Sequence, residues 1–132
     1  MDELVSSWIS QMNEEFVTLG KRAIASRNWR WMPGMLTIPS DGMVSVLMRL
    51  TDKREWPHDI GLRVPDLTDP ATLGCLLYLV RESWGMPTGI IVRYSNDNGR
   101  WEVSWSGSTH GGICGFGATE AEALVMALES VQ

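Results

Sequence analysis

The sequence predicts an α+β domain in which helices pack on an antiparallel β-sheet, with the element order α-ββ-α-ββ(β)-α. Three observations support this class. Apolar residues recur at helical spacing near the N-terminus, alternating segments come in pairs joined by turns, and two later segments begin with helix-capping residues. A length of 132 residues suits one domain, in which 1–27 form an N-terminal helix and 28–132 form the sandwich core.

A long amphipathic helix is expected from about Glu3 to Ser26, because apolar residues form one stripe and no proline interrupts them. The residues of the stripe are Leu4, Val5, Trp8, Ile9, Met12, Phe16, Leu19, Ala23 and Ile24. Such a helix at a terminus either caps the domain or packs against a copy of itself. We therefore expect a homo-oligomer, and 1–27 as its possible contact element.

Two strands joined by a turn are expected next. Met35–Ile38 and Met43–Leu50 have strand character, and Ser40–Gly42 suits the turn between them. The polar stretch Thr51–Ile60 is expected to be a loop, and a short extended piece is expected at Gly61–Val64.

The middle of the chain carries a helix-start signal. Asp69 can accept hydrogen bonds from the first free amides, and Pro70 suits the first helical position because no amide donor is needed there. The helix Pro70–Trp84 is mostly apolar and is therefore expected to be central. Gly85 and the residues after it end the helix.

The C-terminal third predicts a hairpin, a third strand and a last helix. Residues 90–95 and 101–105 alternate around a turn at 96–99, and Ile113–Phe116 forms a possible third strand. Thr119 and Glu122 make a capping box, from which a final helix runs to about Ser130. All strands are expected in a single sheet.

Composition limits the classes of function. A net charge of −5 opposes nonspecific binding to DNA or RNA. The apolar runs are too short for a membrane helix, and the acidic N-terminus does not suit a signal peptide, so a cytoplasmic location is expected. Cys75 and Cys114 are expected to be buried free thiols. The spacing of cysteines and histidines gives no metal site, and we expect no cofactor.

The most informative feature of the composition is seven tryptophans and nine arginines against two lysines. Tryptophan offers a wide stacking face, and arginine a planar fork that grips phosphate or carboxylate. These residue types suit a small, flat, anionic ligand such as a nucleotide. The alternative is that the tryptophans are core or interface anchors and that the arginines are solvated.

The candidate binding site therefore combines stacking rings, phosphate-binding arginines and a glycine-rich loop. In that order, its residues are Trp29, Trp31 and Trp105; Arg30, Arg93 and Arg100; and His110, Gly111 and Gly112. A phosphate clamp needs at least two arginines on one sheet face, and Arg49 is a further candidate for it. The loop lacks the Gly-Lys-Ser/Thr ending of a phosphate-binding loop, and a plain connector is the alternative.

Three stretches, Trp29–Met35, Val64–Leu76 and Gly117–Leu124, resemble small phage and prophage accessory proteins of the α-β-α sandwich type. The resemblance implies helices that flank an antiparallel sheet. It also implies a setting in which small acidic phage proteins counter host defence. Some of these, called sponges, trap immune signals such as cyclic ADP-ribose isomers or cyclic dinucleotides, and they are typically oligomeric with pockets near subunit junctions.

The leading hypothesis is thus a non-enzymatic phage protein that sequesters a nucleotide-derived defence signal in the cytoplasm of the infected host. The first alternative is a protein–protein inhibitor whose exposed tryptophans bind a host enzyme. A hydrolase acting through His110 is a minor alternative. The strand-strand-helix ending at Gly117–Leu124 is also similar to HicB-like antitoxin domains, although their Pro-Asp-Leu-Pro-Gly turn is missing.

Overall fold

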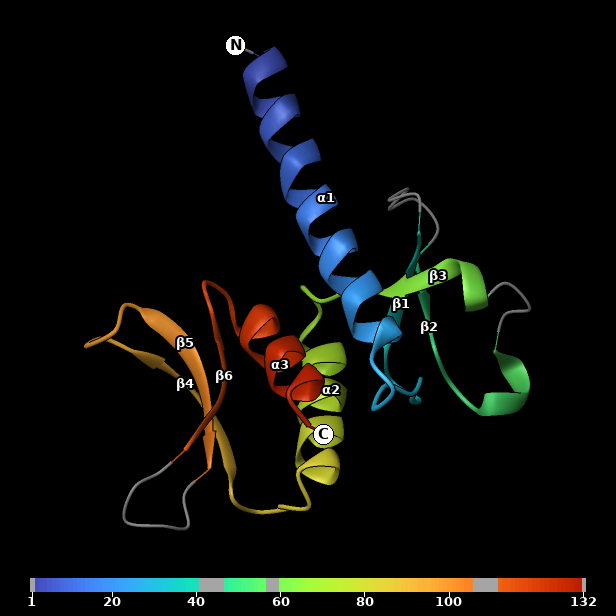
Figure 1. Cartoon of the computed structure of the whole chain (residues 1–132). Coiled ribbons are helices and arrows are strands. Elements are labelled where there is room, and N and C mark those ends of the chain that lie inside the picture. Colours follow the sequence, from blue (N-terminus) through green and yellow to red (C-terminus); the bar gives the residue numbers. More distant parts are fainter. Residues whose placement is uncertain (1, 41–46, 57–59, 106–111, 132) are drawn as a thin grey trace.

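The computed structural model describes the chain except residues 1, 41–46, 57–59, 106–111 and 132, and it describes only the backbone of residues 2–13 and Glu55. The described residues form three α-helices and two three-stranded antiparallel sheets (Figure 1). The predicted α+β class and the predicted order of helices and strands are confirmed. Two residues of the expected turn, 41 and 42, and half of the expected strand Met43–Leu50, residues 43–46, lie outside the described residues. In the other half of that strand, Met48–Arg49 is extended.

The strands form two sheets, whereas the sequence predicts one. In the first sheet β1 (Leu36–Pro39) lies between β2 (Met48–Arg49) and β3 (Arg63–Pro65), which is the short extended piece expected near Gly61–Val64. Because β1 is bonded on both edges and its neighbours are only two and three residues long, this sheet offers no long edge for the later strands. Those strands therefore pair with one another.

The second sheet has the order β4 (Ile90–Ser95), β5 (Arg100–Trp105) and β6 (Ile113–Gly117), which confirms the predicted hairpin and third strand. Residues opposite each other in an antiparallel pair share a face of the sheet. Val92, Val103 and Gly115 are paired across the three strands on the face that the helices cover. We call this side the inner face and the other side the outer face.

The predicted caps hold the second and third helices. In α2 (Pro70–Ser83), the Asp69 side chain accepts from the amide of Thr72. In α3 (Glu120–Glu129), Thr119 Oγ1 accepts from the amide of Glu122 at 3.1 Å. The stretch expected as a loop, Thr51–Ile60, contains the short 3-10 turn η1 (Lys53–Glu55). A second 3-10 turn, η2 (Ile60–Leu62), includes Gly61 and Leu62, so only the second half of the piece expected to be extended at Gly61–Val64 is strand.

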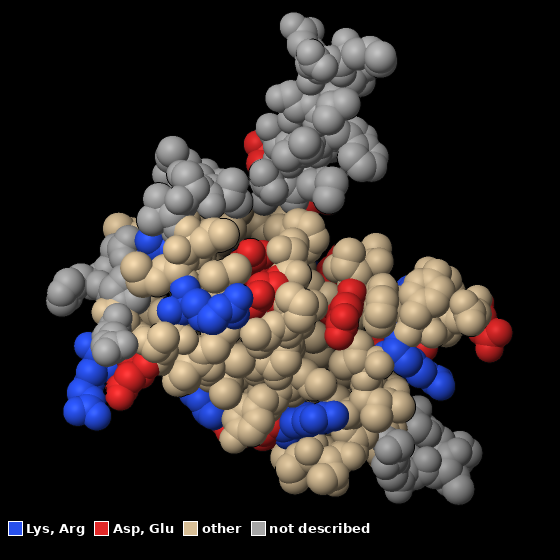
Figure 2. All heavy atoms as spheres, turned by 180° about the vertical axis from the view of Figure 1, so that it is seen from behind, with Lys and Arg blue, Asp and Glu red and all other residues tan. Residues whose placement is uncertain are grey.

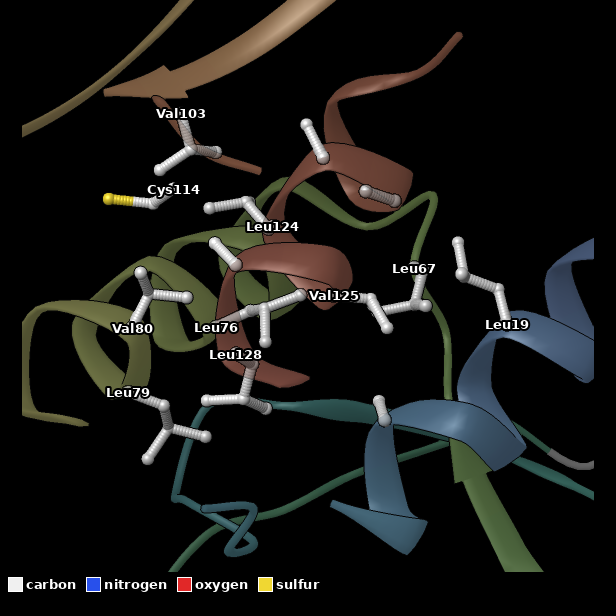
Figure 3. Close-up of a cluster of buried hydrophobic side chains, with 14 of the residues drawn as sticks. Leu19, Leu67, Leu76, Leu79, Val80, Val103, Cys114, Leu124, Val125 and Leu128 are labelled. Carbon is white, nitrogen blue, oxygen red and sulfur yellow. The ribbon is translucent and has the colours of Figure 1, made fainter. Parts of the chain in front are cut away.

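The main core lies where α2, α3 and the inner face of the second sheet meet (Figure 3). Helix α3 approaches β6 so closely that a Cβ added at Gly115 would collide with the backbone of α3 at Ala123 and Ala127. At Gly117 an added Cβ would lie 2.6 Å from Glu122 Cβ. Both expected free thiols are confirmed, with Cys114 buried and Cys75 only partly buried.

The helix α1 (Asp2–Ala25) closes two separate cores. Leu19 and Ala23 belong to the main core, whereas Val17 packs with Ile38 and Val64 of the first sheet in a smaller core. The N-terminal turns of α1 extend away from the rest of the chain (Figure 1). Among the residues that the structure describes, no helix combines the length and the apolar character that a bilayer span requires.

Candidate ligand-binding surface

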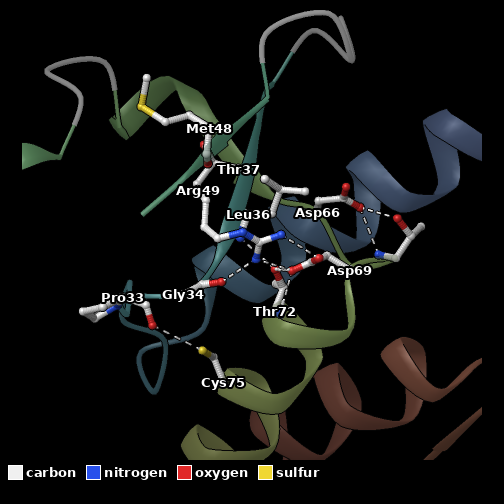
Figure 4. Close-up of polar contacts among 11 residues, drawn as sticks. Pro33, Gly34, Leu36, Thr37, Met48, Arg49, Asp66, Asp69, Thr72 and Cys75 are labelled. Atoms are coloured by element: carbon white, nitrogen blue, oxygen red, sulfur yellow. Dashed lines mark hydrogen bonds and ion pairs between the residues drawn. The ribbon is translucent and has the colours of Figure 1, made fainter. Parts of the chain in front are cut away.

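One of the arginines considered for a phosphate clamp, Arg49, is part of a structural contact (Figure 4). Its guanidinium binds both carboxylate oxygens of Asp69, at 2.9 and 3.0 Å, and donates to the carbonyl oxygen of Gly34 at 2.8 Å. The hydrogen bond from Arg49, together with those from Thr72, lowers the pKa of Asp69 from 3.8 to about 2. Arg49 lies in the first sheet, apart from Arg93 and Arg100 in the second.

The tryptophans of the Trp29–Trp31 segment pack against the protein. Their ring centroids are 5.3 Å apart in an edge-to-face arrangement, and both rings contact the main core. Arg30 points elsewhere and forms a two-pronged ion pair with Glu82 on α2, with its guanidinium 5.9 Å from the Tyr78 ring. These contacts favour the alternative interpretation of the Trp29–Trp31 segment, in which the two indole rings are core anchors.

Trp105 also belongs to the inner face. It is paired with Ile90 across the sheet and packs against the main core. The backbone of Gly112 lies directly against its indole, since a Cβ added there would overlap the ring. His110 and Gly111, the other members of the predicted loop site, lie outside the described residues.

Arg93 and Arg100 do share a face of the sheet, as a phosphate clamp requires. The register pairs Arg93 with Glu102 and Ser95 with Arg100, and all four side chains are on the outer face. On the same face Phe116 is opposite Glu102, and Ile113 is opposite Ser104. The complete row of outer-face residues is Ile91, Arg93, Ser95, Arg100, Glu102, Ser104, Ile113 and Phe116.

Arg100 is held in a fixed position on the outer face. Its guanidinium lies 4.1 Å from the centroid of the Phe116 ring, and its Nε donates to Glu102 at 3.1 Å. Glu102 also accepts from the side-chain amide Nδ2 of Asn98 at 2.9 Å. The Asn98 hydrogen bond first, and then Arg100, lower the pKa of Glu102 below its usual range, so the carboxylate is ionised at neutral pH. Its side chain is only 5% exposed because its neighbours on the sheet cover it.

A groove begins beside this stacked pair. It has a volume of about 410 Å³, within the range of small-molecule sites, and lies between the β5–β6 side of the second sheet and the helices. We call it the arginine groove. Its lining residues are Arg22, Gly99, Arg100, Phe116, Gly117, Ala118, Glu122 and Met126.

A larger hollow of about 630 Å³ lies between α1 and the start of α3. Its charged lining residues are Glu14, Glu15, Glu122 and Arg22, so acidic side chains outnumber basic ones. This charge disfavours an anion. The arginine groove, with two arginines and one glutamate, is the better anion site despite its smaller volume.

The face of the molecule shown in Figure 2 does not carry, among its described residues, a continuous basic patch of the kind that a nucleic-acid backbone needs. On the side of the molecule shown in Figure 2, the described basic side chains are scattered and acidic ones lie among them. Within the described residues, no three His, Cys, Asp or Glu side chains come together as a metal site.

The structure thus brings together two of the predicted site residues, Arg93 and Arg100, and separates them from Trp29, Arg30, Trp31 and Trp105. Sequence reasoning did not select Phe116, Glu102 or Arg22. Strand alternation around Arg100 predicts the position of Glu102, but no local pattern predicts that Arg22 of α1 reaches the same groove. No protein-family model, curated protein or solved structure matches this chain.

Proposed function

We propose that this protein binds a small, nucleotide-derived anion without transforming it, and that the ligand lies in the arginine groove. The observation that carries the proposal is the Arg100 guanidinium stacked 4.1 Å from the Phe116 centroid at the wall of that groove. Arg22 is the second arginine that lines the groove, whereas Arg93 lies on the same sheet face as Arg100 but outside the lining.

The chemistry of the groove supports a nucleotide over a simple anion. A guanidinium on an aromatic ring provides a flat surface for a base and N–H donors for phosphate. Gly99 has no side chain and no atom within 4 Å of where a Cβ would be, which lets a ligand approach its backbone closely. Arg100 is one third exposed, at 34%, and is therefore accessible from solvent.

The biological role in this proposal is that of a phage sponge for an immune signal, either a cyclic ADP-ribose isomer or a cyclic dinucleotide. The resemblance of Trp29–Met35 and Val64–Leu76 to phage accessory proteins supports this setting. Sequestration at nanomolar concentration needs a binding free energy of about −12 kcal/mol. A ligand that stays partly open to water makes too few contacts to reach this value easily. The proposal therefore includes a second copy of the chain that covers the bound ligand.

The test is a thermal-shift and calorimetric titration with ADP-ribose, cyclic ADP-ribose isomers, cyclic dinucleotides and AMP. A ligand at 100 times its dissociation constant stabilises the fold by about 2.7 kcal/mol, which raises Tm by several degrees. Chromatography after heat denaturation should return the ligand unchanged. A wild-type protein that shows no shift with any compound refutes the proposal.

Variants locate the site. Arg100→Lys keeps a positive charge beside Glu102 but removes the flat fork, and Phe116→Leu keeps an apolar side chain but removes the ring. Each should weaken binding by about tenfold or more, as expected for the loss of a stacked or charge-assisted contact. Arg54→Lys is the matched control, because its side chain is 90% exposed and lies in η1, outside the groove. Equal losses in the control and in Arg100→Lys would exclude this groove.

A second candidate function is protein–protein inhibition through the outer face. Ile91, Ile113 and Phe116 are 42%, 49% and 40% exposed, and they lie on the same side of one sheet. Exposed apolar side chains beside arginine are typical of binding hot spots. Under this function, the double variant Ile91→Ser/Ile113→Ser no longer inhibits the host enzyme. The nucleotide titrations of the wild-type protein show no binding.

A further inference from the structure

We infer that Arg22 is the second phosphate-binding residue of the arginine groove, and that the groove selects ligands with two phosphoryl groups over ligands with one. This inference rests on the proposed function. It names the chemical class of the ligand and assigns a binding role to a residue of α1.

Arg22 and Arg100 enter the groove from different parts of the chain. Arg22 is in the last turn of α1, Arg100 begins β5, and Glu122 and Met126 of α3 line the groove with them. A ligand with one phosphoryl group at each arginine carries two anionic groups. A mononucleotide with one phosphate can bind only one of the two arginines.

Arg22 forms an ion pair with Glu129, and a phosphate of the ligand can replace the Glu129 carboxylate. Its Nη2 lies 2.6 Å from Glu129 Oε1, and its Nε donates to Oε2 at 3.3 Å. The two side chains are 46% and 35% exposed, and exposed ion pairs of this kind contribute little to stability. Glu129 is also at the C-terminus of α3, where the helix dipole disfavours a carboxylate. Exchanging Glu129 for a phosphate therefore costs little.

Two backbone donors near the N-terminus of α3 are already used. The Ala118 amide donates to Glu122 Oε2 at 3.2 Å, and the Glu122 amide donates to Thr119 Oγ1 at 3.1 Å. The cap thus satisfies these backbone donors and holds the Glu122 carboxylate. Among the side chains that line the groove, Arg22 and Arg100 are the two cations, so Arg22 is the side chain that can attract a second phosphate.

The experiment compares ADP-ribose with AMP by calorimetry, on wild type and three single variants. Arg22→Gln should weaken ADP-ribose binding by about tenfold or more and change AMP binding by less than about twofold. Glu129→Gln should strengthen ADP-ribose binding, because it releases Arg22. Lys21→Gln is the matched control, since Lys21 is the exposed neighbour of Arg22 on α1 and does not line the groove. If wild type binds a cyclic dinucleotide instead, that compound replaces ADP-ribose.

The outcomes separate this inference from the proposed function. Loss of the preference for ADP-ribose over AMP in Arg22→Gln supports the inference. If Arg100→Lys weakens binding but Arg22→Gln binds like wild type, or like Lys21→Gln, the inference is wrong and the proposed function stands. If wild type binds no compound of the panel, the proposed function itself is wrong. Urea denaturation of each variant verifies that the fold is retained.

Discussion

The substitution Asp69→Asn tests the contact between β2 and the start of α2. The Asp69 carboxylate caps α2 and binds Arg49, which also holds Gly34. A pKa lowered from 3.8 to about 2 means that this group stabilises the native state when ionised. The lowering of about 1.8 corresponds to at most about 2.4 kcal/mol. The Arg49 side chain is 46% exposed and screened by water, so about 1 to 2 kcal/mol is the realistic value.

The sign of the pH dependence follows from the lowered pKa. The contribution is complete above the unfolded value of 3.8 and is lost as pH falls from about 4 toward 2. Asparagine still caps the helix but carries no charge. Asp69→Asn should therefore be less stable than wild type by about 1 to 2 kcal/mol at pH 7, and the two proteins should converge near pH 2.

Urea denaturation between pH 7 and pH 2, followed by circular dichroism, measures this difference. Asp52→Asn is the control, because Asp52 also caps a helix and pairs with an arginine, but its side chain is 56% exposed. Its stability curve should stay close to that of wild type at every pH. If the curve for Asp69→Asn runs parallel to the wild-type curve down to pH 2, the assigned role of the carboxylate is wrong.

Further substitutions test the packing of the main core by the same denaturation assay. Gly115→Ala should destabilise by about 1 to 3 kcal/mol because its Cβ would collide with the backbone of α3, whereas Gly74→Ala in α2, where no atom lies near, should stabilise by about 0.5 to 1 kcal/mol. Trp84→Phe removes a 2.9 Å hydrogen bond from the indole to the Ala127 carbonyl. The buried indole N–H of Trp29 has no acceptor among the described residues, so Trp29→Phe removes no such bond. Trp84→Phe should therefore lower the free energy of unfolding by about 1 kcal/mol more than Trp29→Phe. Equal losses at the two tryptophans would contradict that assignment, as would a neutral Gly115→Ala.

The parts of the fold that depend on local sequence were predicted correctly. Asp69 and Thr119 mark the starts of α2 and α3 because a side-chain oxygen next to free amides is sufficient to cap a helix. The hairpin of β4 and β5 follows from alternation and a polar turn. These signals act over a few residues, and no distant contact overrides them here.

The division into two sheets was not predictable, because it depends on which edges remain available after β1 has been paired on both sides. The candidate site was only partly predicted, for a related reason. Tryptophan and arginine are informative as residue types, but Trp29 and Trp31 pack on the core and Arg30 pairs with Glu82, all through tertiary contacts. Arg22 reaches the arginine groove only because α1 docks beside α3.

The position of α1 between the two cores links the sheets mechanically. Val17 fixes one side of the helix to the first sheet, and Leu19 and Ala23 fix another side to the main core. Close-packed side chains resist gradual displacement, so a rotation of the helix that relieves one core strains the other. A load applied to the extended N-terminal turns of α1 is thus transmitted to both sheets at once, and to Arg22 at the end of the same helix.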